Sequence, residues 1–122
     1  SVLPGQKMKH SVKLKYNALV EKLYESFLYR DTRYVSDFLH KDLDFRSCNM
    51  ADLCITKEEY IYRTDDINET ITNDASHFKP VLTEGHDGSC YIEMQYKSTT
   101  DILRIEEKDG LIYRIEITPK KV

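Results

Sequence analysis

The segment SCYIEMQYKSTTDILRIE, residues 89–106, contains two runs in which apolar and polar side chains alternate. This period of two is typical of a β-strand that buries one face. In the second run the acid Asp101 shares the apolar face of Leu103 and Ile105. The segment therefore predicts two neighbouring strands with one acid set into a buried face. The apolar face of the first strand consists of Cys90, Ile92, Met94 and Tyr96.

The same alternation continues on both sides of this segment. Residues 78–84 form an earlier run that carries Pro80, which cannot donate to a β-ladder and is therefore expected in an edge strand. Asp87-Gly88 and Asp109-Gly110 separate the runs and supply residues that tolerate the positive φ of a tight hairpin. A curled antiparallel meander over residues 78–117 follows. Its last strand places on the apolar face Leu111, Tyr113, Ile115 and Ile117.

Helical periodicity governs the first part of the chain. Apolar side chains recur at three- and four-residue steps from residue 11 or 12 to about residue 29, which predicts a first helix. Asp31 or Thr32 can cap a second, shorter helix. The apolar side chains of this second helix are Val35, Phe38 and Leu39.

A short strand and a third helix complete the N-terminal half. Residues 43–47 alternate again and predict the strand, and residues 48–55 predict a loop. Thr56 and Glu59 have the spacing of a capping box, in which Thr56 accepts from the Glu59 amide and Glu59 reaches back. The third helix is then expected to run to about Ile67.

The order of these elements predicts the fold class. Helices that precede a run of antiparallel strands are typical of the α+β class. We expect three N-terminal helices packed in the concave face of a curved mixed or antiparallel sheet, in the order ααβαββββ. Such an arrangement leaves a cone with one open mouth. Residues 1–10 have no period and are expected to form a flexible arm, and residues 11–122 a single domain.

Composition and motifs exclude several classes of function. The chain has 122 residues, 40% hydrophobic and 32% charged, with a net charge of −3 and the two signs mixed, so we expect neither a nucleic-acid nor a membrane partner. No apolar segment approaches transmembrane length. The four histidines are widely separated, no pair has metal-ligand spacing, and no glycine-rich phosphate loop occurs. We therefore expect no metal and no cofactor.

The three cysteines bear on the compartment. An odd number does not suggest a disulfide framework, although Cys48 and Cys54 flank a short loop and can pair if their geometry allows. We expect free, buried thiols in a reducing compartment, which favours the cytoplasm over secretion.

Four stretches carry a resemblance to a known superfamily. They are YESFLYRD at 24–31, FLHKDLDFRS at 38–47, TKEEY at 56–60 and TDILRIEEKDGLI at 100–112. In this order, over about residues 15–120, the chain resembles the nuclear transport factor two-like superfamily, which includes SnoaL-like proteins, ketosteroid isomerases and limonene epoxide hydrolases. The resemblance implies a cystatin-like cone fold, an apolar pocket between sheet and helices, and often a homodimer through the outer face of the sheet.

Asp101 is the candidate catalytic residue. On the isomerase pattern it matches the acid that stays protonated and donates a hydrogen bond to a ligand oxygen, and an apolar setting disfavours its ionised form. The alternative is that Asp101 pairs with Arg46 or Arg104, or meets water at the mouth. The isomerase general base falls at Ser47 or Arg46 here, so the carboxylate that proton abstraction needs is missing.

Three functions follow from this set of residues. The leading hypothesis is a non-catalytic domain that binds a small apolar ligand or a partner, as a homodimer. The second is an isomerase or hydrolase that uses Asp101; the hydrolase chemistry would draw on Asp44 and Arg46. The third is an interaction module acting through the outer face, which carries Tyr91, Glu93, Gln95, Ile102, Arg104 and Glu106. The expected pocket is lined by Tyr16, Leu23, Tyr24, Phe27, Phe45, Met94, Tyr96, Leu103 and Tyr113.

Overall fold

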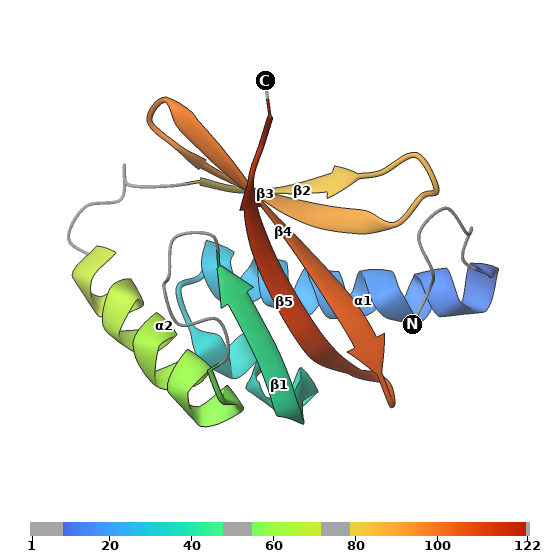
Figure 1. Ribbon diagram of the computed structural model, residues 1–122, viewed down its shortest axis with the longest axis horizontal. Coiled ribbons are helices and arrows are strands. Elements are labelled where there is room, and N and C mark those ends of the chain that lie inside the picture. Colours follow the sequence, from blue (N-terminus) through green and yellow to red (C-terminus); the bar gives the residue numbers. More distant parts are fainter. Residues whose placement is uncertain (1–8, 48–54, 72–78, 122) are drawn as a thin grey trace.

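The fold is an α+β arrangement of a five-stranded sheet and two helices (Figure 1). The computed structural model describes residues 9–47, 55–71 and 79–121. Within these residues the helices are α1 (His10–Leu28) and α2 (Lys57–Ile71). The strands are β1 (Leu39–Ser47), β2 (Lys79–Glu84), β3 (Cys90–Tyr96), β4 (Thr99–Lys108) and β5 (Leu111–Pro119). Their order is β1-β5-β4-β3-β2, in which β1 runs parallel to β5 and the other pairs are antiparallel.

The predicted meander is confirmed, and its turns follow the expected chemistry. Asp109 and Gly110 have φ values of 58° and 78°, the pair of positive values that a two-residue hairpin of the primed type requires. Gly88 has φ 82° in the β2–β3 connection. Pro80 lies in β2, which is an edge strand. The ladder therefore loses no hydrogen bond to this proline in the interior of the sheet.

The second predicted helix is wrong. Residues 32–34 and 36–38 form two short 3₁₀ turns, and Leu39 already begins β1. Asp31 caps the first turn by accepting from the Arg33 amide at 2.9 Å. Thr32 donates to the Asp65 carboxylate of α2 at 2.6 Å, so a tertiary hydrogen bond holds this segment in place. The helical order is therefore one long helix, a turn segment, and a second helix after β1.

The predicted face of β5 is wrong at its first residues. A β-bulge shifts the register between Glu106 and Glu107, so that Glu106 pairs with Arg114 but Glu107 pairs with Ile112. The period of two is therefore interrupted at Tyr113. Ile112 is fully buried together with Ile115, whereas the Tyr113 ring lies edge-on to His40, 5.4 Å between centroids.

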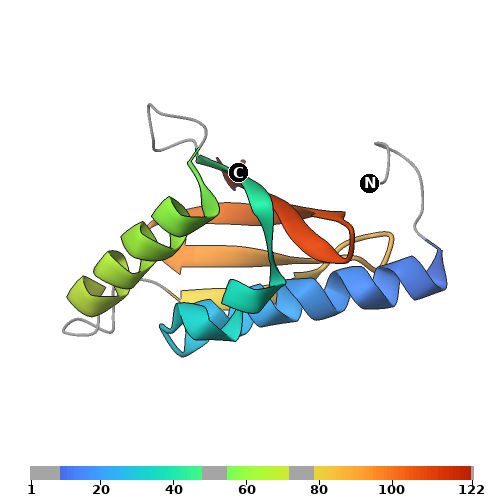
Figure 2. The same cartoon turned by 90° about the horizontal axis from the view of Figure 1, so that it is seen from below.

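The two helices cover different parts of the sheet (Figures 1 and 2). Helix α1 contacts β2 and β3, and α2 contacts β1. Two side chains of α1 fix its position on the sheet. Tyr16 Oη donates to the Ile105 carbonyl at 3.1 Å, and the Asn17 side chain bonds to the Gly88 carbonyl and the Cys90 amide. Burial of the Tyr16 phenol raises its pKa above the ordinary value of 10.

The start of α2 confirms half of the predicted capping box. The Glu59 amide donates to Thr56 Oγ1 at 3.2 Å. The Glu59 carboxylate instead accepts from Arg63, one turn later, at 2.7 Å. Helix α2 reaches Ile71, four residues further than the periodicity predicts.

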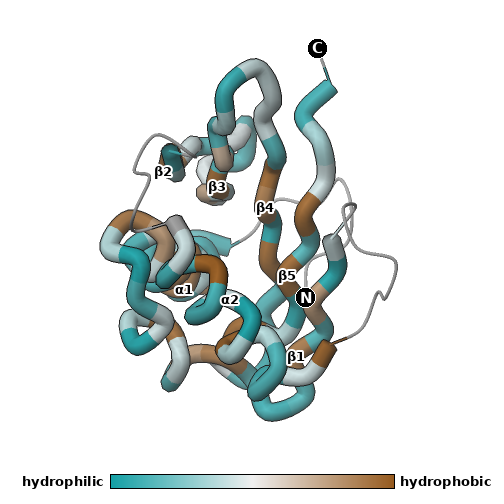
Figure 3. Tube along the Cα trace, turned by 90° about the vertical axis from the view of Figure 1, so that its left-hand side faces the viewer, coloured by the Kyte–Doolittle hydropathy of each residue, from teal (hydrophilic) through white to brown (hydrophobic). Residues whose placement is uncertain are grey.

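The hydrophobic core lies between α1 and the middle of the sheet. Figure 3 shows hydrophobic residues in the central parts of β4 and β5, with hydrophilic ones at the β3–β4 hairpin. Leu23 of α1 is 0% exposed and belongs to a cluster with Ile92, Leu103 and Ile115. The core therefore depends on one face of α1 closing the concave side of β3 and β4.

We predict that Leu23→Ala lowers the free energy of unfolding by about 2–5 kcal/mol, because it removes buried methyl groups and leaves a cavity. Leu14→Ala, on the exposed side of the same helix where Leu14 is 58% exposed, is the matched control and should change it by less than about 0.5 kcal/mol. Urea denaturation followed by circular dichroism measures both. Equal effects of the two substitutions would contradict the assigned face of α1.

Candidate functional site

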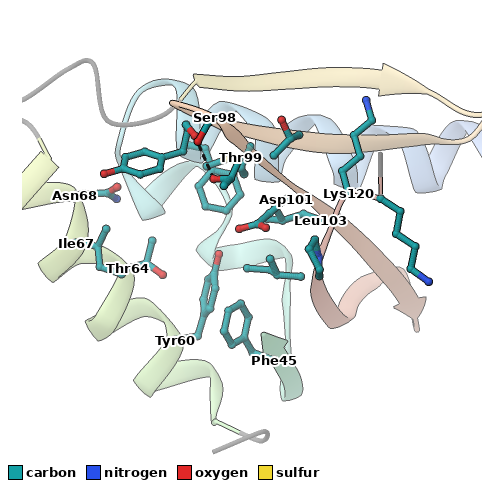
Figure 4. Close-up of a pocket in the computed structure, with 17 residues that line it drawn as sticks. Phe45, Tyr60, Thr64, Ile67, Asn68, Ser98, Thr99, Asp101, Leu103 and Lys120 are labelled. Atoms are coloured by element: carbon teal, nitrogen blue, oxygen red, sulfur yellow. Dashed lines mark hydrogen bonds between the residues drawn. The ribbon is translucent and has the colours of Figure 1, made fainter. Parts of the chain in front are cut away.

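A cavity of about 950 Å³ lies between α2 and the β3–β4 end of the sheet (Figure 4). The apolar part of its wall comes from α1, β1, β3, β4 and β5, through Phe27, Phe45, Met94, Leu103 and Ile117. Hydroxyl and amide side chains line another part, with Thr64 and Asn68 from α2 and residues 98–100 from the hairpin. This volume falls within the range of small-molecule sites, which are mostly apolar with a few placed polar groups.

Tyr60 is the most unusual polar group of the cavity. It lies on α2, is 3% exposed, and its ring packs against Phe45 with 5.0 Å between centroids. Among the described residues its hydroxyl has no hydrogen-bond partner, although burying such a group unpaired costs about 1–3 kcal/mol. Burial raises the pKa of Tyr60 far above the ordinary value of 10, and an interaction with the Thr64 side chain lowers it in part. The phenol is therefore neutral and able to donate.

Asp101 lies in the same cavity, on the face of β4 that it shares with Leu103. In Figure 4 its carboxylate and the Tyr60 hydroxyl point toward one another from opposite walls. The position follows from the alternation of β4, where Asp101 pairs with Met94 of β3 and Pro119 of β5.

The two arginines that the sequence offered as partners of Asp101 make other contacts. Arg46 bonds to Asp44 through Nε and Nη2, the latter at 3.0 Å. The Arg104 guanidinium lies 4.5 Å from the centroid of the Tyr91 ring. These groups follow the opposite period to the cavity-lining residues of their strands.

The set of acids and base expected for catalysis is not assembled. Asp44 alternates with Phe45 along β1, and its carboxylate accepts from Arg46 and from Arg114 of β5. Because Phe45 faces the cavity, Asp44 and Arg46 face the other way. Ser47 shares the period of Phe45 and is buried, but it brings a hydroxyl where proton abstraction from carbon needs a base.

The structure brings together five of the nine predicted pocket residues. The cavity is lined by Phe27, Phe45, Met94, Tyr96 and Leu103. The other four do not line it. Leu23 is fully buried in the core, Tyr16 bonds to the Ile105 carbonyl, Tyr24 packs against the core, and Tyr113 lies beside His40 because of the β5 bulge.

Sequence reasoning missed Tyr60, Thr64 and Asn68 as cavity residues. Tyr60 and Thr64 lie on the apolar side of α2, which the periodicity predicts, but a period cannot tell a core-facing side chain from a cavity-facing one. The signal that could have identified these residues was Asp101, because α2 forms the wall of the cavity opposite to it.

The predictions about metals, thiols and membranes can be compared with the described residues only. The described parts of the chain contain no group of three or more histidine, cysteine or acidic side chains suited to a metal ion. Cys90 is a free thiol whose pKa is raised by burial, while Cys48 and Cys54 lie outside the described residues, as does most of the predicted arm. Neither described helix is long and apolar enough to cross a bilayer.

Comparison with known proteins gives structural matches only. No protein-family model matches the sequence, and no curated protein matches it either. A candidate ketosteroid isomerase from Kribbella flavida has a TM-score of 0.65 and 13% identity over 89% of this chain and 80% of that chain. A steroid delta-isomerase from Pseudomonas aeruginosa has a TM-score of 0.63 and 17% identity over 98% and 85%. An LEH-like epoxide hydrolase from M. tuberculosis has a TM-score of 0.60 and 13% identity over 88% and 84%.

These matches confirm the resemblance at the level of architecture. Each covers four fifths or more of both chains, at identities too low to carry an activity from one protein to another. The predicted α+β class is confirmed with it, apart from the second helix. The chain therefore has the nuclear transport factor two-like cone fold.

Proposed function

We propose that this domain binds a small molecule with an apolar body and one polar group, without converting it. The observation that carries the proposal is the Tyr60 hydroxyl, which is buried in the wall of a cavity of about 950 Å³ and has no hydrogen-bond partner. A ligand that hydrogen-bonds to this phenol would offset the cost of burying it. The apolar wall favours a ligand whose remaining surface leaves water on binding.

The choice of binding over catalysis rests on the polar groups of the wall. Among the described residues that line the cavity, Asp101 is the only carboxylic acid and none is a histidine. On the isomerase pattern Asp101 is the protonated acid, and the separate base that takes the proton from carbon has no counterpart among these lining residues. Asp44, the nearest candidate in the sequence, is instead bonded to Arg46 and Arg114.

An isomerase or hydrolase remains the second candidate function. It is favoured by the facing arrangement of Asp101 and Tyr60, since a carboxyl and a phenol on one side of a ligand oxygen can stabilise developing charge. Solved structures of this fold that are described as isomerases and as an epoxide hydrolase support the same possibility.

A second copy of the chain is the partner that the outer face of the sheet supports. This face combines half-buried Tyr91 and Ile102 with charges that are already paired within the chain. Lys120 bonds to Glu93 at 3.0 Å, and Arg114 bonds to Asp44 and Glu106. Charges that are paired before association leave no unpaired charge when a face is covered. We therefore propose this face as the contact of a homodimer.

Nile red, a neutral apolar dye, tests the cavity. We predict that its fluorescence rises with the wild-type protein and that Thr64→Trp abolishes the rise, because the indole fills the space beside Tyr60. Tyr62→Trp is the matched control on the exposed side of the same helix, where Tyr62 is 74% exposed, and should bind dye like wild type. Unchanged binding by Thr64→Trp would contradict the proposed site.

Measurements of stability test whether the Tyr60 hydroxyl is unpaired in the ligand-free protein. We predict that Tyr60→Phe raises the free energy of unfolding of the ligand-free protein by about 1 kcal/mol, because a buried unpaired hydroxyl is removed. Tyr16→Phe, which deletes the hydroxyl bonded to Ile105, should instead lower it by about 1 kcal/mol. Urea denaturation measures both changes. Equal losses in the two variants would mean that the Tyr60 hydroxyl is paired in solution.

The homodimer is tested by mass in solution. Sedimentation at micromolar concentration should give two chains for wild type and one for Ile102→Lys, because the substitution places an unpaired charge at the contact. Tyr62→Lys, on the exposed side of α2, is the control and should leave the mass unchanged. A monomeric wild type would refute association through this face.

A further inference from the structure

Aromatic rings surround the cavity on several sides. Phe27, Phe45, Tyr60 and Tyr96 line it from α1, β1, α2 and β3, one ring from each element. The face of an aromatic ring attracts a cation within about 6 Å of its centre, and the attraction grows when water is excluded. The wall therefore offers a favourable surface to an organic cation, as well as to an apolar group.

The Asp101 carboxyl group lines the same cavity as these rings. Asp101 points into the cavity opposite Tyr60 (Figure 4) and is half-buried. Each of the two oxygens of a carboxyl group can accept more than one hydrogen bond, so Asp101 can accept from a ligand donor beside its contacts within the protein. A cation placed against it forms a charge-assisted hydrogen bond, which is stronger than one between neutral groups.

The donor and acceptor properties of the two groups narrow the ligand further. An ionised carboxylate accepts only, and a phenol can donate or accept. A ligand carbonyl can pair with Tyr60 alone. An ammonium group has several N–H donors and can bond to the Asp101 carboxylate and the Tyr60 oxygen together, and the rings around it favour its charge.

We propose that the cavity selects an organic amine in its protonated form, with an apolar body, and that Asp101 and Tyr60 hold the nitrogen. This inference rests on the proposed binding function and names its ligand class. It assigns Phe27 to the attraction of the cation, whereas the Tyr96 ring already has the Lys97 ammonium 5.5 Å from its centroid.

Two lysines also line the cavity, and their charges have to be accounted for. The Lys120 ammonium bonds to Glu93, 3.0 Å away, and that pairing raises the pKa of Lys120. Glu93 follows the opposite period to Met94, so this ammonium is drawn to the outer face of the sheet. Lys121 is exposed. Charges in contact with water are screened by salt over about 8 Å at physiological ionic strength, so repulsion from the rim is weak.

Three ligands share one rigid apolar body and differ only in the polar group, so their affinities report the contribution of that group. They are 1-adamantylamine, 1-adamantanol and 1-adamantanecarboxylate. We expect calorimetric titration at 150 mM salt to show the amine binding at least about tenfold more tightly than the alcohol, with the carboxylate weakest. Asp101→Asn should remove the preference, so that amine and alcohol bind with similar affinities, and a circular dichroism spectrum like that of wild type reports that the fold is intact. Asp101→Glu should restore part of the preference.

Asp109→Asn is the matched control, because Asp109 is an exposed acid at the far hairpin and asparagine tolerates its positive φ. It should leave all three affinities unchanged. Alcohol or carboxylate binding as tight as that of the amine, or an amine preference that survives Asp101→Asn, would overturn the amine inference while the binding function stands. Failure of all three ligands to bind would overturn both.

Discussion

In the described part of the chain, the two helices cover the concave side of the five strands only in part. Helix α1 contacts β2 and β3, and α2 contacts β1, while the cavity lies against the inner face of β4 and β5 near the β3–β4 hairpin. The contacts that set α1 in place, from Tyr16 to Ile105 and from Asn17 to Cys90, lie at the other end of the sheet. The fold therefore concentrates its packing at one end and leaves space at the other.

This division explains why polar groups are tolerated where they lie. A buried phenol without a partner is a net cost in a packed core, and the core tyrosine Tyr16 has its carbonyl partner. Tyr60 lacks one only because it lines the open end. An acid in the apolar row of β4 is acceptable there for the same reason. Stability is supplied by Leu23, Ile92 and Ile115, which the cavity does not touch.

The strands and two of their turns could be predicted because local chemistry decides them: alternation sets β3 and β4, and Asp-Gly pairs set the β2–β3 and β4–β5 connections. Two features could not be predicted from the sequence, because contacts between residues distant in sequence decide them. The segment after α1 forms 3₁₀ turns held by the bond from Thr32 to Asp65, and the bulge before Glu107 turns Tyr113 away from the cavity. Asp101 was found because an acid stands out in an apolar row, whereas Tyr60 looks like any residue on the apolar side of a helix.

The same cone accommodates proteins described as isomerases and as an epoxide hydrolase, so the fold cannot decide the chemistry. Here β1 presents Phe45 and Ser47 on its inner period and holds Asp44 in ion pairs on the other. Because side chains alternate along a strand, the position of an acid on β1 decides whether it faces the cavity or a contact on the opposite face of the sheet. Among the described residues that line the cavity, the one acid, Asp101, lies opposite the Tyr60 hydroxyl, and the proposal of ligand binding rests on these two groups.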